Sequence, residues 1–156
     1  MIHIFYRHTN SAKTGSYRPE WFSYNKCFVN LLKTIALYKD VVKLNVVFDG
    51  DITKNSINTF SNLFNTIEIN AGSDIGSWNE TNQIIKSQCI DNIIKKDDLI
   101  YFLENDYLHV QGWVPKVLEL FNEHKDKYVS LYDHADKYFD YDKLESKIIA
   151  TSNCHW

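Results

Sequence analysis

Apolar and polar positions along the chain follow two alternating periods, which predicts strands and helices in turn. Mostly apolar runs rich in β-branched and aromatic residues are typical of buried strands, whereas apolar residues three and four apart are typical of one face of a helix. The runs that predict strands are residues 2–6, 43–48, 66–69, 99–103 and 128–132, with a weaker one at 147–150. Helical spacing predicts helices over residues 19–38, near 57–64, over 78–96 and from Pro115 onward.

Three local signals set the predicted helix starts. Pro19 with Glu20 behind it suits a first turn, because proline lacks an N–H that the first turn would leave unpaired in any case. Ser77 and Glu80 have the spacing of a capping box, in which the two side chains satisfy free backbone donors at a helix start. Pro115 suits the first turn of the last predicted helix.

Strands that alternate with helices favour an α/β domain. Right-handed crossovers then give an open, mostly parallel sheet with helices on both faces, as in Rossmann-like folds. Residues 99–103 are apolar at every position, which is typical of a central strand covered on both faces. A chain of 156 residues has the size of one domain, so we expect a single domain over residues 1–156.

Polar clusters follow the predicted strands at their carboxyl ends, where ligands of parallel α/β sheets bind. These clusters are Arg7-His8, Asp49-Gly50-Asp51, the loop 72–79, Glu104-Asn105-Asp106 and Asp133-His134. The triplet 104–106 directly follows the most apolar strand. Glu104 and Asp106 are one residue apart and suit one hard cation, Mg²⁺ or Mn²⁺, whose remaining ligands a diphosphate would supply. An acidic pair after a strand is also found in plain solvated turns, and the neighbouring polar clusters favour a site over that alternative.

Charge and cysteine content narrow the class of protein. The formal net charge is -3, which offers no general attraction to nucleic acid, so no nucleic-acid partner is expected. The three cysteines lie far apart without a CxxC pair, which favours a reducing compartment over a zinc site or a disulfide framework. The first residues lack the pattern of a signal peptide and no apolar run is long enough for a membrane span, so we expect a cytoplasmic protein.

The segment 101–107, Tyr-Phe-Leu-Glu-Asn-Asp-Tyr, with Gly112-Trp113 downstream, resembles the Asp-x-Asp segment and following Gly-Trp of A-type (GT-A) glycosyltransferases, particularly family 2. The first strand, residues 48–51 and residues 77–82 extend the resemblance. It implies the GT-A type nucleotide-diphospho-sugar transferase fold, with a hexosyltransferase-like activity. A sugar would move from a nucleoside-diphosphate sugar, UDP- or GDP-linked, to a glycan or other hydroxyl acceptor, by an inverting transfer assisted by Mn²⁺ or Mg²⁺.

The resemblance also implies roles for single residues. Asp106 would be the direct metal ligand, with Glu104 binding through water or a ribose hydroxyl, and His155 resembles a late histidine that ligates the metal in several A-type enzymes. Asp49 or Asp51 would meet the base or ribose. The residues expected to contact the nucleotide sugar are Tyr6, Arg7, Asp49, Asp51, Ser77, Asn79, Glu104 and Asn105.

Inverting transfer needs a carboxylate that takes the proton of the acceptor hydroxyl. Asp133, at the end of the predicted strand 128–132, is the first candidate for this base, and Asp136 and Asp140 are alternatives. Related domains usually continue into an acceptor-binding half, so the chain is expected to be truncated on that side or to be a piece of a longer protein. Such domains occur in bacteria and in large DNA viruses, and a viral origin would place the chain in the host cytoplasm.

Two other functions stay open on the sequence. A non-catalytic module that binds sugar or protein would share the fold and lack the acceptor half. A sugar nucleotidyltransferase shares the layered architecture, but it usually opens with a glycine-rich loop after the first strand, and here residues 7–18 contain only Gly15.

Overall fold

The structure is a computed structural model, and it describes residues 1–10, 18–124, 128–131 and 151–152. The chain divides into two compact units, Met1–Val110 and Gln111–Trp156. Every strand found in the described residues belongs to the first unit.

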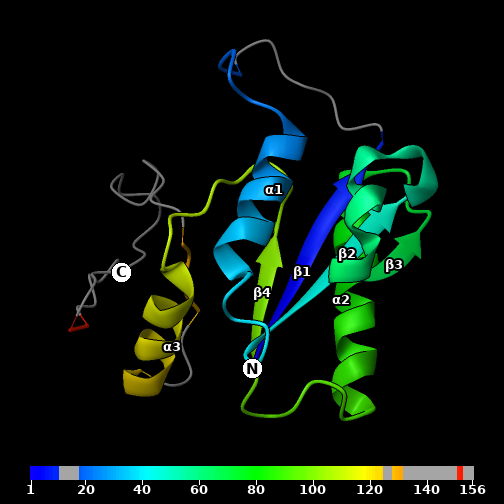
Figure 1. Cartoon of the computed structure of the whole chain (residues 1–156). Coiled ribbons are helices and arrows are strands. Elements are labelled where there is room, and N and C mark those ends of the chain that lie inside the picture. The colour runs from blue at the N-terminus through cyan, green and yellow to red at the C-terminus, as the bar shows by residue number, and fades with distance from the viewer. Residues whose placement is uncertain (11–17, 125–127, 132–150, 153–156) are drawn as a thin grey trace, which may run out of the picture. The chain divides into compact units, whose positions relative to one another are not determined.

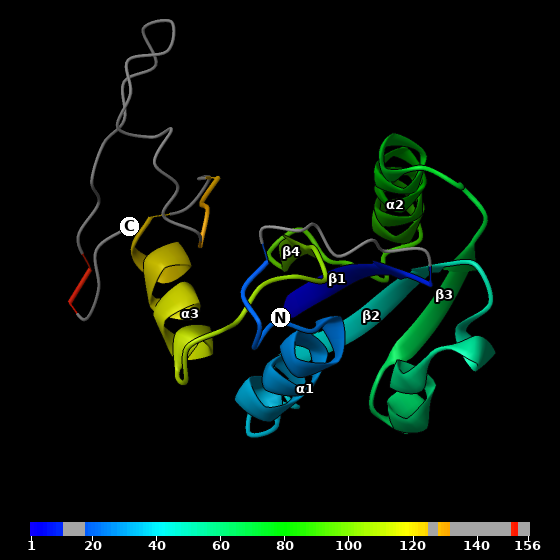
Figure 2. The same ribbon diagram turned by 90° about the horizontal axis from the view of Figure 1, so that it is seen from above.

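A four-stranded sheet, parallel throughout, forms the centre of the first unit (Figure 1). Its strands are β1 (Ile2–Thr9), β2 (Val42–Asp49), β3 (Asn65–Ile69) and β4 (Leu99–Leu103), in the order β3-β2-β1-β4. Helices α1 (Tyr24–Ile35) and α2 (Asp74–Ile90) lie on opposite faces of the sheet (Figure 2). The sequence-based prediction of an α/β fold with a parallel sheet and helices on both faces is confirmed.

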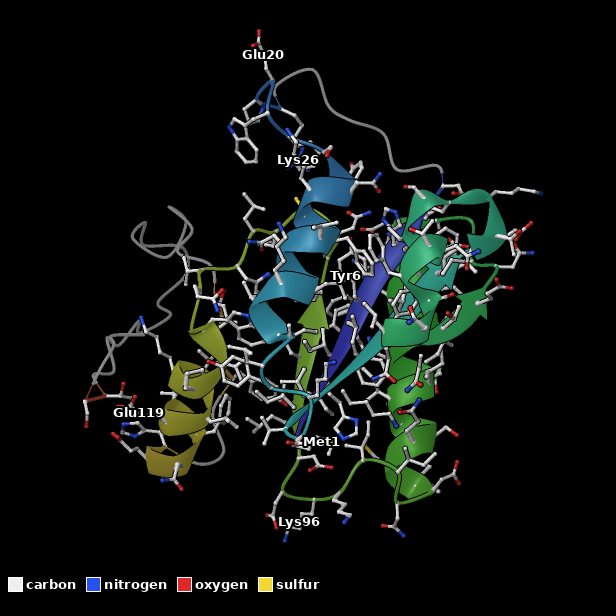
Figure 3. All side chains as sticks on the ribbon, viewed as in Figure 1. Met1, Tyr6, Glu20, Lys26, Lys96 and Glu119 are labelled. Atoms are coloured by element: carbon white, nitrogen blue, oxygen red, sulfur yellow. The ribbon has the colours of Figure 1, made fainter. Side chains whose placement is uncertain are left out.

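The two central strands, β1 and β2, form a large part of the core. On the α2 face, Phe5 and Val47 pack in one apolar cluster with Ile85. On the other face, the ring of Tyr6 lies between α1 and the sheet (Figure 3) and packs against Phe28 at a centroid distance of 5.1 Å. Neighbouring residues of a strand point to opposite faces, so β1 is buried on both sides.

Strand β1 is longer than its apolar run predicts. Arg7 and His8 were expected in a polar loop, but they lie inside β1, which continues to Thr9, and both are buried. A buried polar group is stable where it is paired, and the side chains of Arg7 and His8 both have hydrogen-bond partners. Helix α1 in turn begins later than Pro19, at Tyr24, because Ser23 accepts the amide of Lys26 and caps the helix there.

The predicted capping box at Ser77 is wrong. Ser73 is the N-cap of α2 and accepts a hydrogen bond from the amide of Gly76, which places Ser77 one turn inside the helix, where it is buried. Helix α2 also ends at Ile90 rather than near residue 96. The reason lies in Asn92, whose φ of 57° is left-handed and cannot continue the helix.

Strand β4 has the predicted bounds but is not the central strand that the sequence predicts. It forms one edge of the described sheet, next to β1, and Ile100 is 45% exposed. An apolar run predicts a strand but not its position, since strand order depends on the crossover connections. The predicted strand over residues 128–132 is not present in the described part, residues 128–131, and the candidate at 147–150 lies outside the described residues.

Two 3₁₀ helices, η1 (Ile52–Lys54) and η2 (Ser56–Leu63), replace the helix predicted near residues 57–64. In the second unit, α3 (Trp113–Glu123) follows Gly112, whose φ of 79° favours glycine, and Pro115 lies in its first turn as predicted. None of the helices within the described ranges has the length and apolar character needed to cross a bilayer.

Candidate functional site

The candidate site lies at the carboxyl edge of the sheet, and the strand register determines which residues meet there. Thr9 of β1 pairs with Asp49 at the end of β2, whereas Leu103 at the end of β4 pairs with Tyr6. Strand β4 therefore stops short of β1 by three residues. The triplet that follows it, residues 104–106, runs beside the last part of β1.

Arg7 joins the triplet to helix α2. Its Nη2 donates to Glu104 Oε1 at 2.6 Å, and its Nη1 donates to the Asp74 carboxylate and carbonyl oxygens at 3.0 and 3.1 Å. The guanidinium also lies over the rings of Trp78 and Phe102, 5.4 and 5.3 Å from their centroids. Arg7 thus links three elements of the first unit: β1, the β4 end and the start of α2.

The surroundings explain how a permanently charged side chain is buried inside a strand. Arg7 is 7% exposed; two carboxylates pair with its charge, and its Cζ lies 5.4 and 5.3 Å from the centroids of two aromatic rings. Charge-assisted hydrogen bonds and cation–π contacts both offset the loss of hydration. Arg7 Nε has no hydrogen-bond partner within the described residues. The guanidinium is therefore fixed in place, with Glu104 held on the α2 side of the edge.

His8 and Asn105 form a second link between β1 and the triplet. Asn105 Nδ2 donates to His8 Nδ1 over 2.7 Å. Burial lowers the pKa of His8 to about 4, so the imidazole is neutral near pH 7 and can accept this bond. The His8 ring also packs against Phe48 and against Tyr24 of α1. Asn105 therefore points to the α1 side of the edge, opposite to Glu104.

Asp106 is paired with an arginine from a distant part of the chain. Arg18 Nη2 donates to Asp106 Oδ2 at 2.5 Å, and the Arg18 guanidinium lies 4.7 Å from the ring centroid of Phe22. Burial raises the pKa of the Tyr6 hydroxyl, and the charge of Asp106 raises it further. The Tyr6 hydroxyl has no hydrogen-bond partner in the described part of the chain. Asp106 hence faces the α1 side, together with Tyr6.

The two carboxylates of the predicted metal pair therefore face different surroundings. Glu104 is held by Arg7 beside α2, whereas Asp106 is held by Arg18 beside α1. Throughout the described ranges, no three His, Cys, Asp or Glu side chains gather as a group that could hold a metal ion. The third predicted metal ligand, His155, and the predicted base, Asp133, lie outside the described residues.

The acidic residues after β2 form hydrogen bonds with the backbone. Asp49 accepts the amides of Ala71 and Gly72, at 2.9 and 3.0 Å, and so ties the end of β2 to the loop before α2. Asp51 is the N-cap of η1, accepts the amide of Thr53 and is half exposed. The structure places both carboxylates at the carboxyl edge. Their contact with a base or ribose stays a prediction.

The remaining residues that were predicted to contact the ligand differ in their exposure to solvent. Tyr6 is 2% exposed and Ser77 is buried in the second turn of α2, whereas Asn79 is exposed on the same helix. Arg7, Glu104 and Asn105 are brought together by direct hydrogen bonds with the β1 end. Among the predicted contacts, Arg7 and Glu104 are therefore joined directly, and Asn105 is joined to β1 through His8.

Two residues of the site were missed from the sequence. Asp74 was hidden by the misplaced start of α2, although an acidic residue directly after a serine is a common first-turn signal. Arg18 lies outside every periodic segment, and no local pattern links it to Asp106, 88 residues away. Only the fold brings this pair together.

The arrangement combines fixed positive charge with carboxylate oxygens at a parallel sheet edge. Arginine recognises phosphate through paired N–H donors, and carboxylate oxygens bind Mg²⁺ or Mn²⁺. Comparison of the chain with protein-family models, with curated proteins and with solved structures found no match in any of the three.

Proposed function

We propose that the chain is a nucleotide-sugar-dependent glycosyltransferase domain with a GT-A type fold. The observation that supports this most is the convergence of Arg7, Asp49 and the triplet 104–106 on one edge of an all-parallel sheet. This is the edge at which such sheets bind nucleotides. The activity is transfer of a sugar from a nucleoside diphosphate, UDP or GDP, to a hydroxyl acceptor.

In this proposal the divalent cation binds at Asp106, which the resemblance implies as the direct metal ligand. Its Oδ2 takes Arg18, and a carboxylate with two oxygens has room for more than one partner. Glu104 is fixed by Arg7 on the other side, which suits contact through a water or a ribose hydroxyl better than a shared direct bond. Mn²⁺ or Mg²⁺ bound there would supply Lewis-acid stabilisation of a diphosphate leaving group.

The chain's own residues have three tasks in this proposal. Arg7 orients Glu104 and holds the start of α2 beside it through Asp74. Asp49 fixes the loop before α2, so that this loop and the β4 end form two sides of the donor site. A carboxylate base for the acceptor hydroxyl remains assigned to Asp133 from the sequence alone.

Isothermal titration with a panel of UDP- and GDP-sugars, with and without Mn²⁺, tests donor binding. The proposal expects one nucleotide to bind only with Mn²⁺, and Asp106→Asn to abolish that binding. Asp40→Asn makes the same charge change at an exposed residue before β2, at the far end of the strands, and should bind as the wild type does. Absence of metal-dependent binding across the panel would contradict the proposal.

Release of nucleoside diphosphate tests the chemistry separately. The wild-type protein with Mn²⁺ and the bound donor should release the diphosphate slowly, because water can replace the acceptor hydroxyl. Binding without release in the presence of a range of simple glycans would instead indicate the non-catalytic sugar-binding module.

A further inference from the structure

Trp78 of α2 exposes an aromatic ring beside the candidate site. The ring packs against Phe102 at a centroid distance of 4.0 Å and lies 5.4 Å from Cζ of Arg7, yet the residue is 46% exposed. Ile75, three residues earlier and so next to it on the helix, is 75% exposed. Two large apolar side chains therefore lie open to solvent at the start of α2. Exposed apolar surface with a polar rim is typical of a binding site.

Asp74 supplies a carboxylate beside this aromatic ring. It lies four residues before Trp78 and hence on the same side of α2. Its Oδ1 accepts a hydrogen bond from Arg7 at 3.0 Å, whereas no such bond to its Oδ2 is found within the described ranges, and the side chain is 86% exposed. Oδ2 of Asp74 can therefore accept a hydrogen bond from a hydroxyl group of a ligand that stacks on Trp78.

The charge around Arg7 restricts the kind of ligand. One guanidinium pairs with two carboxylates, Asp74 and Glu104, which leaves an excess of negative charge. A phosphate or another anion would be repelled there, and a purely apolar ligand would cover the Asp74 oxygen without replacing its water. A neutral sugar ring meets both conditions, because its C–H face is apolar and its rim carries hydroxyl donors.

We propose that Trp78 and Asp74 form the acceptor subsite, in which Trp78 stacks against a neutral sugar ring and Asp74 accepts a hydrogen bond from one of its hydroxyl groups. This inference rests on the proposed function, because it assigns the ring to the acceptor. Arg7 holds Asp74 and Glu104 on one guanidinium, so the subsite adjoins the triplet that is proposed to bind the donor. Transfer requires two substrates in such neighbouring positions. The acceptor class is hence a glycan.

An NMR titration of the isotope-labelled protein tests the subsite with the methyl glycosides of glucose, galactose and mannose. It is run without nucleotide and again with UDP or GDP and Mn²⁺. A glycoside should shift the indole N–H signal of Trp78, which Trp78→Phe identifies by its absence, and the sugar C–H protons should show nuclear Overhauser contacts with the Trp78 ring. Methyl glucuronide, which adds a carboxylate to the same ring, should bind about threefold more weakly than methyl glucoside.

Three variants separate stacking from a general effect on the fold. Trp78→Leu removes the ring and keeps an apolar side chain against Phe102, so glycosides should bind about tenfold more weakly. Asp74→Ala should weaken their binding about threefold. Trp21→Leu is the matched control, because Trp21 is 53% exposed and packs against Phe22 instead, and it should bind glycosides as the wild type does. Circular dichroism checks each fold, and the Overhauser contacts in the wild type need no variant.

The outcomes distinguish the subsite from the proposed function. The subsite is overturned if no glycoside contacts Trp78 under either condition, if folded Trp78→Leu binds as the wild type does, or if nucleosides stack on Trp78 in place of glycosides. Displacement of the glycoside by a saturating nucleotide sugar with Mn²⁺ would assign the ring to the donor and contradict the acceptor role. Glycosides on Trp78 without any metal-dependent nucleotide binding would overturn the transferase and leave a sugar-binding module, whereas nucleotide binding without glycoside contact would contradict the subsite alone.

Discussion

Replacement of Arg7 by alanine should destabilise the first unit by more than the loss of two solvent-exposed ion pairs alone would. The side chain crosses from the end of β1 to the start of α2 and the end of β4. Its removal takes away two ion pairs, two aromatic contacts and the packing of a buried stem. These contributions can be estimated separately from the structure.

The ion pairs are the smaller part of the effect. Glu104 and Asp74 are 48% and 86% exposed, so each pair is worth about 0.2–1 kcal/mol, as for surface pairs. Each ring contact, with Trp78 or Phe102, contributes about 0.5–1 kcal/mol. Loss of the stem leaves a partly filled cavity that costs about 1–2 kcal/mol. Because neighbouring contributions are not additive, we expect a total of about 3 kcal/mol for Arg7→Ala.

Arg7→Met is the matched control, because methionine keeps most of the stem packing and removes the charge. Its expected cost is about 1 kcal/mol, since the buried charge no longer has to be desolvated. Urea unfolding followed by circular dichroism gives both free energies of unfolding. Equal destabilisation by the two variants would refute the view that packing of the Arg7 side chain contributes more to stability than its charge does. A loss below about 1 kcal/mol for Arg7→Ala would refute the expected total of about 3 kcal/mol.

Three further predictions concern acid and loop stability. Because the pKa of His8 is lowered from 6.5 to about 4 by burial, the unfolded chain takes up this proton first, so stability should fall as the pH decreases from about 6.5 toward 4. The His8 ring signals in an NMR titration should then stay constant above pH 5. The hydrogen bond from the Lys95 amide, with others, lowers the pKa of Asp98 to about 2, so its contribution is complete above about pH 4 and is lost as the pH falls toward 2. Asp98→Asn should lower the free energy of unfolding by about 1 kcal/mol at pH 7. In urea titrations of this variant, the loss of stability between about pH 4 and pH 2 should be smaller than in the wild type. Asp49→Ala leaves two backbone amides without their acceptor and should cost about 1–2 kcal/mol in the same assay, whereas Asp51→Ala, at a half-exposed turn, should cost less.

Local patterns predicted the type of most elements but the bounds of few, because apolar period is a local property whereas helix and strand ends depend on caps and tertiary partners. Residues 99–103 were predicted as a strand with the observed bounds, and Pro115 was correctly placed in a first turn. The polarity of Arg7 was read as the start of a loop. That prediction failed because the partner that makes Arg7 stable inside a strand, Glu104, lies 97 residues away in the chain.

Helix starts were ambiguous for a different reason. Ser77 and Glu80 satisfy the pattern of a capping box, but Ser73 lies one turn earlier and also fits a cap, and only the backbone at residue 73 decides between them. The position of β4 at the edge of the described sheet was likewise hidden, since strand order is set by the crossovers.

The site was predictable in composition but not in pairing. The sequence placed Glu104 and Asp106 directly after a strand over residues 99–103, and the structure agrees, although that strand lies at the sheet edge and is not buried. The sequence contained no signal that each of the two carboxylates would pair with a different arginine, because Arg18 meets Asp106 only through the tertiary fold. Pairing of this kind depends on strand register, which a single sequence does not specify.

Diffraction from crystals soaked with Mn²⁺ and a mixture of UDP- and GDP-sugars tests the donor site most directly. The account predicts an anomalous Mn²⁺ peak at Asp106, a diphosphate bound to that ion, and Glu104 still held by Arg7. Nucleotide bound away from the carboxyl edge of the sheet, or no Mn²⁺ at Asp106 at saturating concentrations, would contradict it.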